Sequence, residues 1–129
     1  MDCSQNQLTS LDVSQNTGLI LLNCSQNQLP SLDVSNNTIL TLLWCWSNQL
    51  YSLDISTNTN LIELWCSYNQ LTSLDVRNGN NTSMVLFIAI NNPFTCIMVD
   101  DIAWSQTNWT NANGNIDVGV TFGDNIVPC

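Results

Sequence analysis

A pattern that recurs every 21 residues constrains this chain more than any other feature of its sequence. The pattern reads L-x-x-L-x-C-x-x-N-Q-L-x-S-L-D-V/I and occurs at residues 19–34, 40–55 and 61–76. The chain begins within a further copy, at residues 3–13. Self-similarity at a fixed period of this length is typical of solenoids, in which each unit buries its apolar edge only against its neighbours.

Each copy predicts one turn of such a solenoid. Leu22 and Cys24 alternate with polar or variable positions, which is the period of a short strand with one buried face. In the return segment that follows, Leu32 and Val34 are expected to point inward and Asp33 outward. One asparagine per turn is expected to hydrogen-bond buried backbone groups. These asparagines are Asn6, Asn27, Asn48, Asn69 and Asn92.

The period is lost after Arg77. Two extra residues enter the corner at 78–81, and the next strand is expected over 84–90, with Phe87 and Ala89 in place of Leu and Cys. Further along, the sequence predicts a short strand at residues 96–99, a short helix or turn at 100–109 and a last strand at 118–122. We therefore divide the chain into about five repeat turns over residues 1–95, the first one partial, and a terminal cap over residues 96–129, because a solenoid needs an atypical unit over its last turn.

The charge balance restricts the partners. Arg77 is the one basic residue against ten acidic ones, which gives a net charge of −9. Nucleic acids and anionic membrane surfaces are bound through Lys and Arg, so we expect neither as a partner. No run of about 20 apolar residues predicts membrane insertion, and no signal peptide is recognisable. Because the first turn starts without a cap, we interpret the chain as a piece of a longer protein.

The motif L-x-x-L-x-C-x-x-N-Q-L resembles the consensus of leucine-rich repeats, with cysteine at one leucine position. The 21-residue form with Leu-Asp-Val-Ser-x-Asn-Thr resembles secreted leucine-rich repeat proteins of Bacteroidetes-type bacteria, and residues 96–129 resemble their C-terminal cap. The resemblance implies an α/β-type, mostly β, right-handed solenoid with a parallel concave sheet and short extended convex segments. It also implies a secreted or cell-surface location, although no sorting segment is recognisable, and binding in place of catalysis. In an exported protein, Cys96 and Cys129 are expected to form a disulfide.

The residue types argue against an enzyme. The chain has no His, and its single Glu, Glu63, lies on the concave strand while the repeated aspartates lie on the return segment. A glycosidase needs two carboxylates that face each other across one cleft. The repeat cysteines point into the core and lack the neighbouring base that activates a thiol. We expect them to pack as small apolar side chains, with metal binding or disulfides among them as the alternative, and we expect no cofactor.

Four aspartates recur at one position of the return segment: Asp12, Asp33, Asp54 and Asp75. Neighbouring turns would place their like charges about 5 Å apart, which is costly unless the charges are screened or bridged. We interpret the column as a solvated acidic stripe. Calcium is the alternative, because this ion favours carboxylate oxygens.

The concave strands carry the candidate binding site, because their outward positions vary between copies and are apolar or aromatic in the middle turns. The candidate partner-binding residues are Leu42, Trp44, Trp46, Glu63, Trp65, Tyr68, Leu86, Ile88 and Ile90. Ser25 and Ser67 occupy further outward positions of the same strands. An inverted strand, which would place all of these side chains in the core, is the competing interpretation.

Trp and Tyr dominate binding hot spots. We therefore predict a non-catalytic extracellular binding or adhesion module whose aromatic concave face binds a protein partner. Two alternatives remain. A second copy of the chain could form a dimer or filament, through this face or through the uncapped N-terminal end. A glycan could stack on the tryptophans, although sugars also need many polar contacts.

Overall fold

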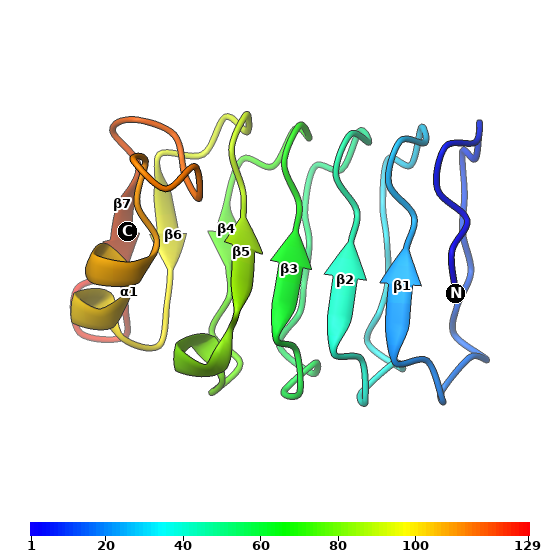
Figure 1. Cartoon of the computed structure of the whole chain (residues 1–129), viewed down its shortest axis with the longest axis horizontal. Helices are drawn as coiled ribbons and strands as arrows, with labels where there is room; N and C mark the ends of the chain where they lie inside the picture. The colour runs from blue at the N-terminus through cyan, green and yellow to red at the C-terminus, as the bar shows by residue number, and fades with distance from the viewer.

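A computed structural model describes residues 1–129, and it shows turns of chain stacked side by side in a row (Figure 1). One strand from each middle turn contributes to a four-stranded parallel sheet. Its strands, in order, are β1 (Leu21–Asn23), β2 (Leu42–Trp44), β3 (Glu63–Trp65) and β5 (Leu86–Ile88). Leu22 pairs with Leu43, and Leu43 with Leu64, so the register follows the 21-residue period. The predicted solenoid with a parallel sheet is confirmed.

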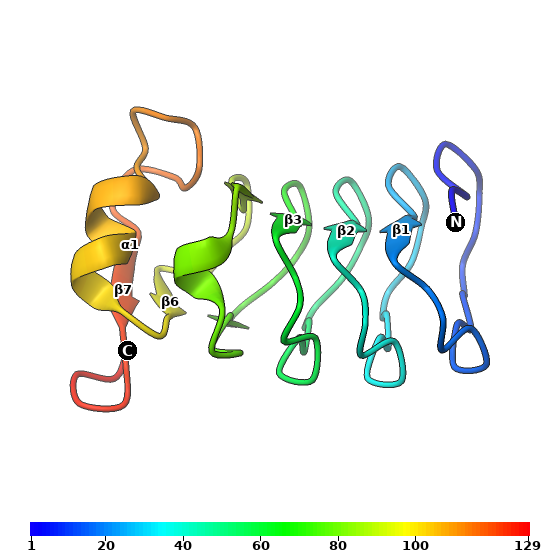
Figure 2. The same cartoon turned by 60° about the horizontal axis from the view of Figure 1, so that its bottom comes forward.

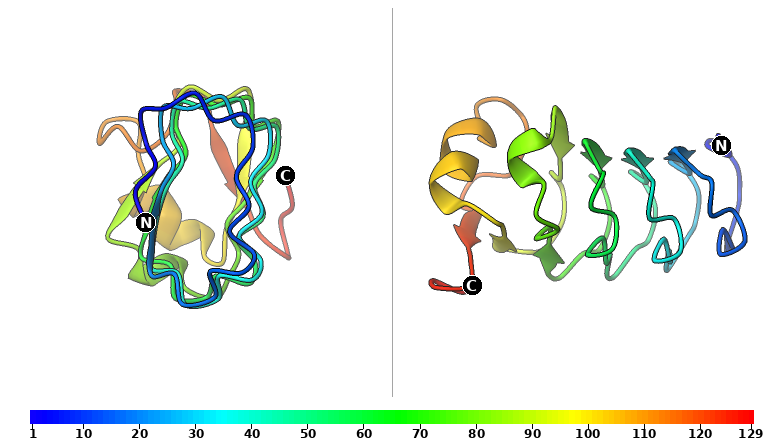
Figure 3. Two further views of the ribbon diagram at one scale, coloured as in Figure 1. Left: turned by 90° about the vertical axis from the view of Figure 1, so that its right-hand side faces the viewer. Right: turned by 90° about the horizontal axis from the view of Figure 1, so that it is seen from below.

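The return segments form the opposite side of the solenoid, as the view along the stack shows (Figure 3). Three of them pair as a second parallel sheet, in the order β4 (Leu74–Asp75), β6 (Cys96–Met98) and β7 (Thr121–Gly123). The strand expected at residues 96–99 is therefore present, and its Ile97 pairs with Leu74. This register places β6 at the return position of the fifth turn, whereas the boundary between repeats and cap at residue 96 stays a prediction.

The core consists of columns of side chains from equivalent positions of successive turns. Three such columns are Leu22, Leu43, Leu64 and Phe87; Cys24, Cys45, Cys66 and Ala89; and Val34, Ile55, Val76 and Val99. Full burial of one Leu, Ile or Val side chain stabilises a fold by about 1.5–3 kcal/mol. No turn can gain this alone, because each turn buries these side chains against the turns above and below it.

The predicted asparagine column is confirmed, and Asn48 shows how it works. Its Nδ2 donates to the carbonyls of Cys24 and Cys45, both at 3.1 Å, while its Oδ1 accepts from the backbone N–H of Leu29 at 3.0 Å. The amide thus joins two successive turns at a buried corner. A second column runs along the other corner, where Asn37 donates to the carbonyls of Val13 and Asn16. Asn58 repeats the arrangement, and Asn78 continues it with a single bond to the carbonyl of Asn58.

The last turn replaces its strand by the helix α1 (Ile102–Asn108), which packs against β7 (Figure 2). Asp101 begins the helix, because its Oδ1 accepts the backbone N–H of Trp104 at 2.9 Å. The following loop covers the open edge of β5. Asn115 accepts the backbone N–H of Ala89 through its carbonyl and donates its side-chain amide to the carbonyl of Phe87, at 2.8 and 2.7 Å.

Several boundaries differ from those expected. The 3₁₀ helix η1 (Asn81–Ser83) takes up the extra residues of the corner, so that the following strand is confined to β5. The last strand begins later than expected, at Thr121. Gly119 before it has a φ of +86°, which ends the preceding turn in a conformation that favours glycine.

The C-terminal tail closes on β6 through the predicted disulfide between Cys96 and Cys129. Gly123 makes this approach possible, because a Cβ at this position would lie 2.6 Å from the backbone nitrogen of Cys129. No helix in the structure has the length and apolar character needed to cross a membrane.

Candidate functional site

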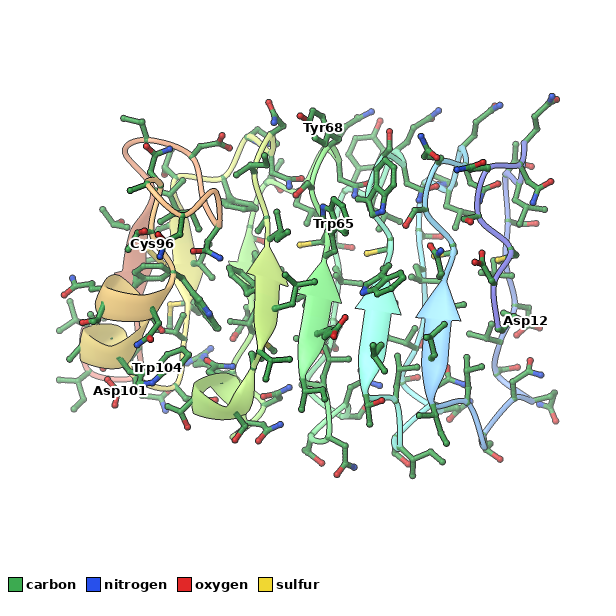
Figure 4. The ribbon with its side chains drawn as sticks, in the orientation of Figure 1. Asp12, Trp65, Tyr68, Cys96, Asp101 and Trp104 are labelled. Atoms are coloured by element: carbon green, nitrogen blue, oxygen red, sulfur yellow. A yellow bond between two sulfur atoms is a disulfide. The ribbon has the colours of Figure 1, made fainter.

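The outward side of the first sheet carries the candidate site, which we call the tryptophan face. It comprises Leu42, Trp44, Trp46, Glu63, Trp65, Tyr68, Leu86, Ile88 and Ile90. All are half-buried except Tyr68, which is 54% exposed. Trp65 projects from the front of β3 and Tyr68 lies at the corner above it (Figure 4).

The strand register places these side chains in two rows across the sheet. Glu63 lies between Leu42 and Leu86 in one row. Trp65 lies between Trp44 and Ile88 in the other. Neighbouring strands are about 4.8 Å apart, so the side chains of each row touch laterally and form one continuous surface.

Two tryptophans of this surface stack on each other. The rings of Trp46 and Trp65 have centroids 5.1 Å apart and an interplanar angle of 23°. Because stacking already holds the two rings in place, binding of a partner would cost little side-chain entropy at these residues. Large rigid rings of this kind act as anchors in interfaces. The Nε1 of Trp65 is buried without a hydrogen-bond acceptor.

Glu63 is held by the third tryptophan, since Trp44 donates its indole N–H to Glu63 Oε2 at 3.1 Å. This is a cross-strand contact between β2 and β3. It fixes one carboxylate oxygen and the plane of one indole ring on the same part of the surface.

Tyr68 reaches its position through an unusual backbone conformation. Its φ is +56°, as are those of Gln5 and Ser47 at the same position of other turns, with Gln26 at +55°. This left-handed corner precedes each asparagine of the column. The corner therefore directs whichever residue occupies it outward, and in this turn that residue is a tyrosine.

Two of the residues expected to be exposed on this face are not. Ser25 and Ser67 are buried, with 1% and 0% exposure, and neither hydroxyl has a hydrogen-bond partner. Both occupy the position of the repeat that the half-buried Trp46 occupies in the turn between them, and their short side chains are covered where the large indole is not. The inverted-strand interpretation is wrong, because Leu22, Leu43 and Leu64 are fully buried.

The acidic stripe lies on the return segments, away from the tryptophan face. Each carboxylate accepts the backbone N–H of the residue two positions later, at 2.9 Å for Asp12, Asp33 and Asp54 and 3.0 Å for Asp75. The structure gathers no group of three or more His, Cys, Asp or Glu side chains that could hold a metal ion. Calcium binding at the stripe stays a prediction.

These hydrogen bonds lower the pKa values of the aspartates. The pKa of Asp12 is lowered first by the backbone N–H of Ser14, and that of Asp33 first by the Ser35 side chain. The Arg77 side chain has the same effect on the pKa of Asp75. Like charges raise the pKa of Asp54, but less than its hydrogen bonds lower it. Local hydrogen bonding therefore outweighs the repulsion expected along the column.

We expect acid to destabilise the fold through this stripe. A carboxylate whose pKa is lowered in the folded chain stabilises the fold above its unfolded pKa of about 4, and the stabilisation is lost as the pH falls through the folded value. The melting temperature should therefore fall between pH 4 and pH 2. Asp33→Asn keeps the acceptor without the charge, so its melting temperature should fall less. An equal fall in this variant would contradict the explanation.

The repeat cysteines form an unpaired column in the core. Cys24, Cys45 and Cys66 are buried free thiols, and Cys3 at the first turn is half-buried. Burial raises the pKa of Cys24 and of Cys66 to about 12 and that of Cys45 well above its usual value. Thiolate is the reactive form, so these three side chains are inert at neutral pH.

Thiol labelling should distinguish Cys3 from the three buried cysteines of this column. With dithionitrobenzoate at pH 8, only Cys3 of the four free thiols should react in the folded protein, and slowly, because partial burial also raises its pKa. All four should react in denaturant. Cys3→Ser should leave no reactive thiol in the folded chain, and labelling of Cys45 under native conditions would show that the column is open.

Comparison with known proteins supports the fold. No protein-family model matches the chain, and no curated protein matches it. Among solved structures, it is similar to the functional domain of InlJ from Listeria monocytogenes, which is described as including a cysteine ladder. The sequences are 33% identical over 79% of this chain, with a TM-score of 0.67. The match covers 26% of the InlJ chain, so this chain spans about a quarter of that structure.

The similarity agrees with the geometry of the present chain, in which four cysteines at 21-residue spacing lie in one column. Its stacked turns and its parallel sheet form a solenoid of the leucine-rich repeat type. Folds of this type are typically non-catalytic and commonly bind proteins, but the same scaffold serves many ligands.

Proposed function

We propose that this chain is a non-catalytic binding or adhesion module that recognises a protein partner through the tryptophan face. The observation that carries the proposal is the continuous set of half-buried aromatic and aliphatic side chains across β2, β3 and β5. Apolar side chains stay partly exposed on these strands although the buried columns already form the core of the solenoid. An exposed patch that the core does not need is typical of an interaction site.

A protein partner accounts for this surface better than the alternatives do. Sugar recognition needs many polar contacts, and the C-terminal half of the face offers only the aliphatic Leu86, Ile88 and Ile90. Self-association would bring together two chains that each carry a net charge of −9, which opposes assembly at low ionic strength.

We also infer that the module acts outside the cell. The disulfide between Cys96 and Cys129 supports this, because such bonds persist mainly in oxidising compartments. The repeat form further favours an origin among exported leucine-rich repeat proteins of the Bacteroidetes type. Detection of the protein in the culture medium or on intact cells would test the location.

Photo-cross-linking tests the use of the face. A benzoyl-phenylalanine at Tyr68 should capture proteins from an extracellular-protein extract, and Trp65→Ala in the same chain should abolish capture. Tyr51 provides a matched control, because it is 58% exposed but lies at the start of a return segment. Equal capture from both positions would contradict the proposal. Sedimentation against concentration and a glycan array would detect the two alternatives.

A further inference from the structure

Glu63 is the unusual member of the tryptophan face. Its neighbours in register are Leu42 and Leu86, so a carboxylate stands between two aliphatic side chains. One oxygen accepts the indole N–H of Trp44, and no hydrogen bond reaches the other. In the free protein water can solvate that second oxygen, because Glu63 is only half-buried.

A partner that covers this face removes that water. Burying a carboxylate without a compensating charge or donors is strongly unfavourable, which would offset much of the gain from covering the tryptophans. The tight binding of this face therefore requires a positively charged or strongly donating group opposite Glu63.

No basic side chain of this chain lies near Glu63. Arg77 is its one basic residue, and it lies on the opposite side of the solenoid, where it forms an ion pair with Asp75 and donates to Asn125. A second copy docked face to face would bury two Glu63 carboxylates and would bring no basic side chain to either of them. The complementary charge must come from a different molecule, and the net charge of −9 attracts molecules of opposite sign.

The surroundings of Glu63 also suit a cation. Trp44 holds the carboxylate, and Trp65 lies two residues further along the same strand, in register with Trp44. Indole rings attract Arg and Lys side chains by cation–π interaction, and the planar guanidinium also stacks on them. A basic side chain could pair with Glu63 while its aliphatic stem covers the rings.

We propose that the partner presents an arginine or lysine side chain that pairs with Glu63 and lies against Trp44 and Trp65. This inference rests on the proposed function and specifies the chemistry of the partner. It also predicts a polypeptide with a local positive charge within an otherwise apolar contact surface.

Selection from a phage-displayed library of random peptides tests the inference. Wild-type protein is the target, and folded Trp65→Ala and Trp44→Ala variants, checked by circular dichroism, are used for counter-selection. Peptides that need the tryptophan face should be enriched in Arg or Lys. For a synthesised peptide of this set, Glu63→Gln should weaken binding about tenfold or more, and replacement of the peptide Arg by citrulline should do the same. Asp33→Asn is the matched control, because it removes the same charge from the other side of the molecule and should leave the affinity unchanged.

The outcomes separate the two proposals. Face-dependent peptides without basic residues, or equal affinity for wild type and Glu63→Gln, would overturn the cation inference and leave the binding function standing. Equal weakening by Glu63→Gln and Asp33→Asn would reduce the effect to general charge attraction and also overturn it. Absence of any peptide that depends on the tryptophans would overturn both.

Discussion

Asn48→Asp is expected to destabilise the protein by about 4 kcal/mol or more at pH 7, a large share of the 5–15 kcal/mol that stabilises a typical domain. The substitution keeps the size of the side chain and the acceptor for Leu29. It replaces the two N–H donors by a charged oxygen 3.1 Å from the carbonyl oxygens of Cys24 and Cys45. Those carbonyls keep one donor each, from Asn27 and Asn69, so the main cost is a buried charge facing two acceptors.

The pH dependence should identify that cause. Burial and the two carbonyls raise the pKa of the new carboxyl in the folded chain. The variant therefore regains stability relative to wild type as the pH falls from 7 towards 4, because protonation removes the charge and restores one donor. Urea unfolding of wild type and variant at pH 7 and pH 4 measures the difference in their free energies of unfolding. Gln49→Glu makes the same amide-to-acid change at an exposed neighbour and should cost under about 0.5 kcal/mol. Similar costs for both variants would show that the column does not join the turns.

The repeat allowed most of the fold to be predicted, because a fixed period in a solenoid is also a spatial register. Once Cys24, Cys45 and Cys66 occupy one column, every other position of the pattern follows, including the rows of the tryptophan face. The second asparagine column was missed, although Asn16, Asn37 and Asn58 share the same spacing. The spacing alone does not distinguish an asparagine that stabilises its own corner from one whose side chain links two turns.

Features that depend on interactions between non-equivalent positions could not be predicted in this way. The Trp46–Trp65 stack joins residues at different positions of adjacent turns, and the period says nothing about rotamers. The N–H of Trp44 on Glu63 is a contact of the same kind. Ser25 and Ser67 are buried although Trp46 at the same position of the repeat is only half-buried, so exposure depends on side-chain size as well as on position. Position on the face was therefore predictable, and side-chain geometry was not.

The C-terminal turn shows the same limit, because it departs from the repeat. Its core is an aromatic cluster centred on Trp109, which is 3% exposed. Trp109 stacks on Phe87 with centroids 4.1 Å apart, meets Trp104 edge-on at 5.4 Å and approaches Phe122 at 6.2 Å. Phe87 takes the place of a repeat leucine, so the last regular strand is already adapted to the cap. The sequence shows that Phe87 replaces a leucine, but it does not show that Phe87 stacks on Trp109.

Trp109→Ala should accordingly cost about 3–5 kcal/mol, as expected for a large buried aromatic side chain. Because each turn of a solenoid contacts only its neighbours, the loss should be concentrated at the C-terminal end. Hydrogen exchange should show early loss of protection in α1, in β7 and at Ala89, whose N–H is bonded by Asn115, while β1 to β3 stay protected. Trp104→Ala removes the edge-on neighbour from a half-buried site and should cost less. Uniform loss of protection along the chain would contradict local unfolding.

Release of the cap would also expose the edge of β5 and the Leu86–Ile88 end of the tryptophan face, so the variant should aggregate through this end. The aromatic cluster around Trp109 therefore holds the C-terminal turn over the edge of β5.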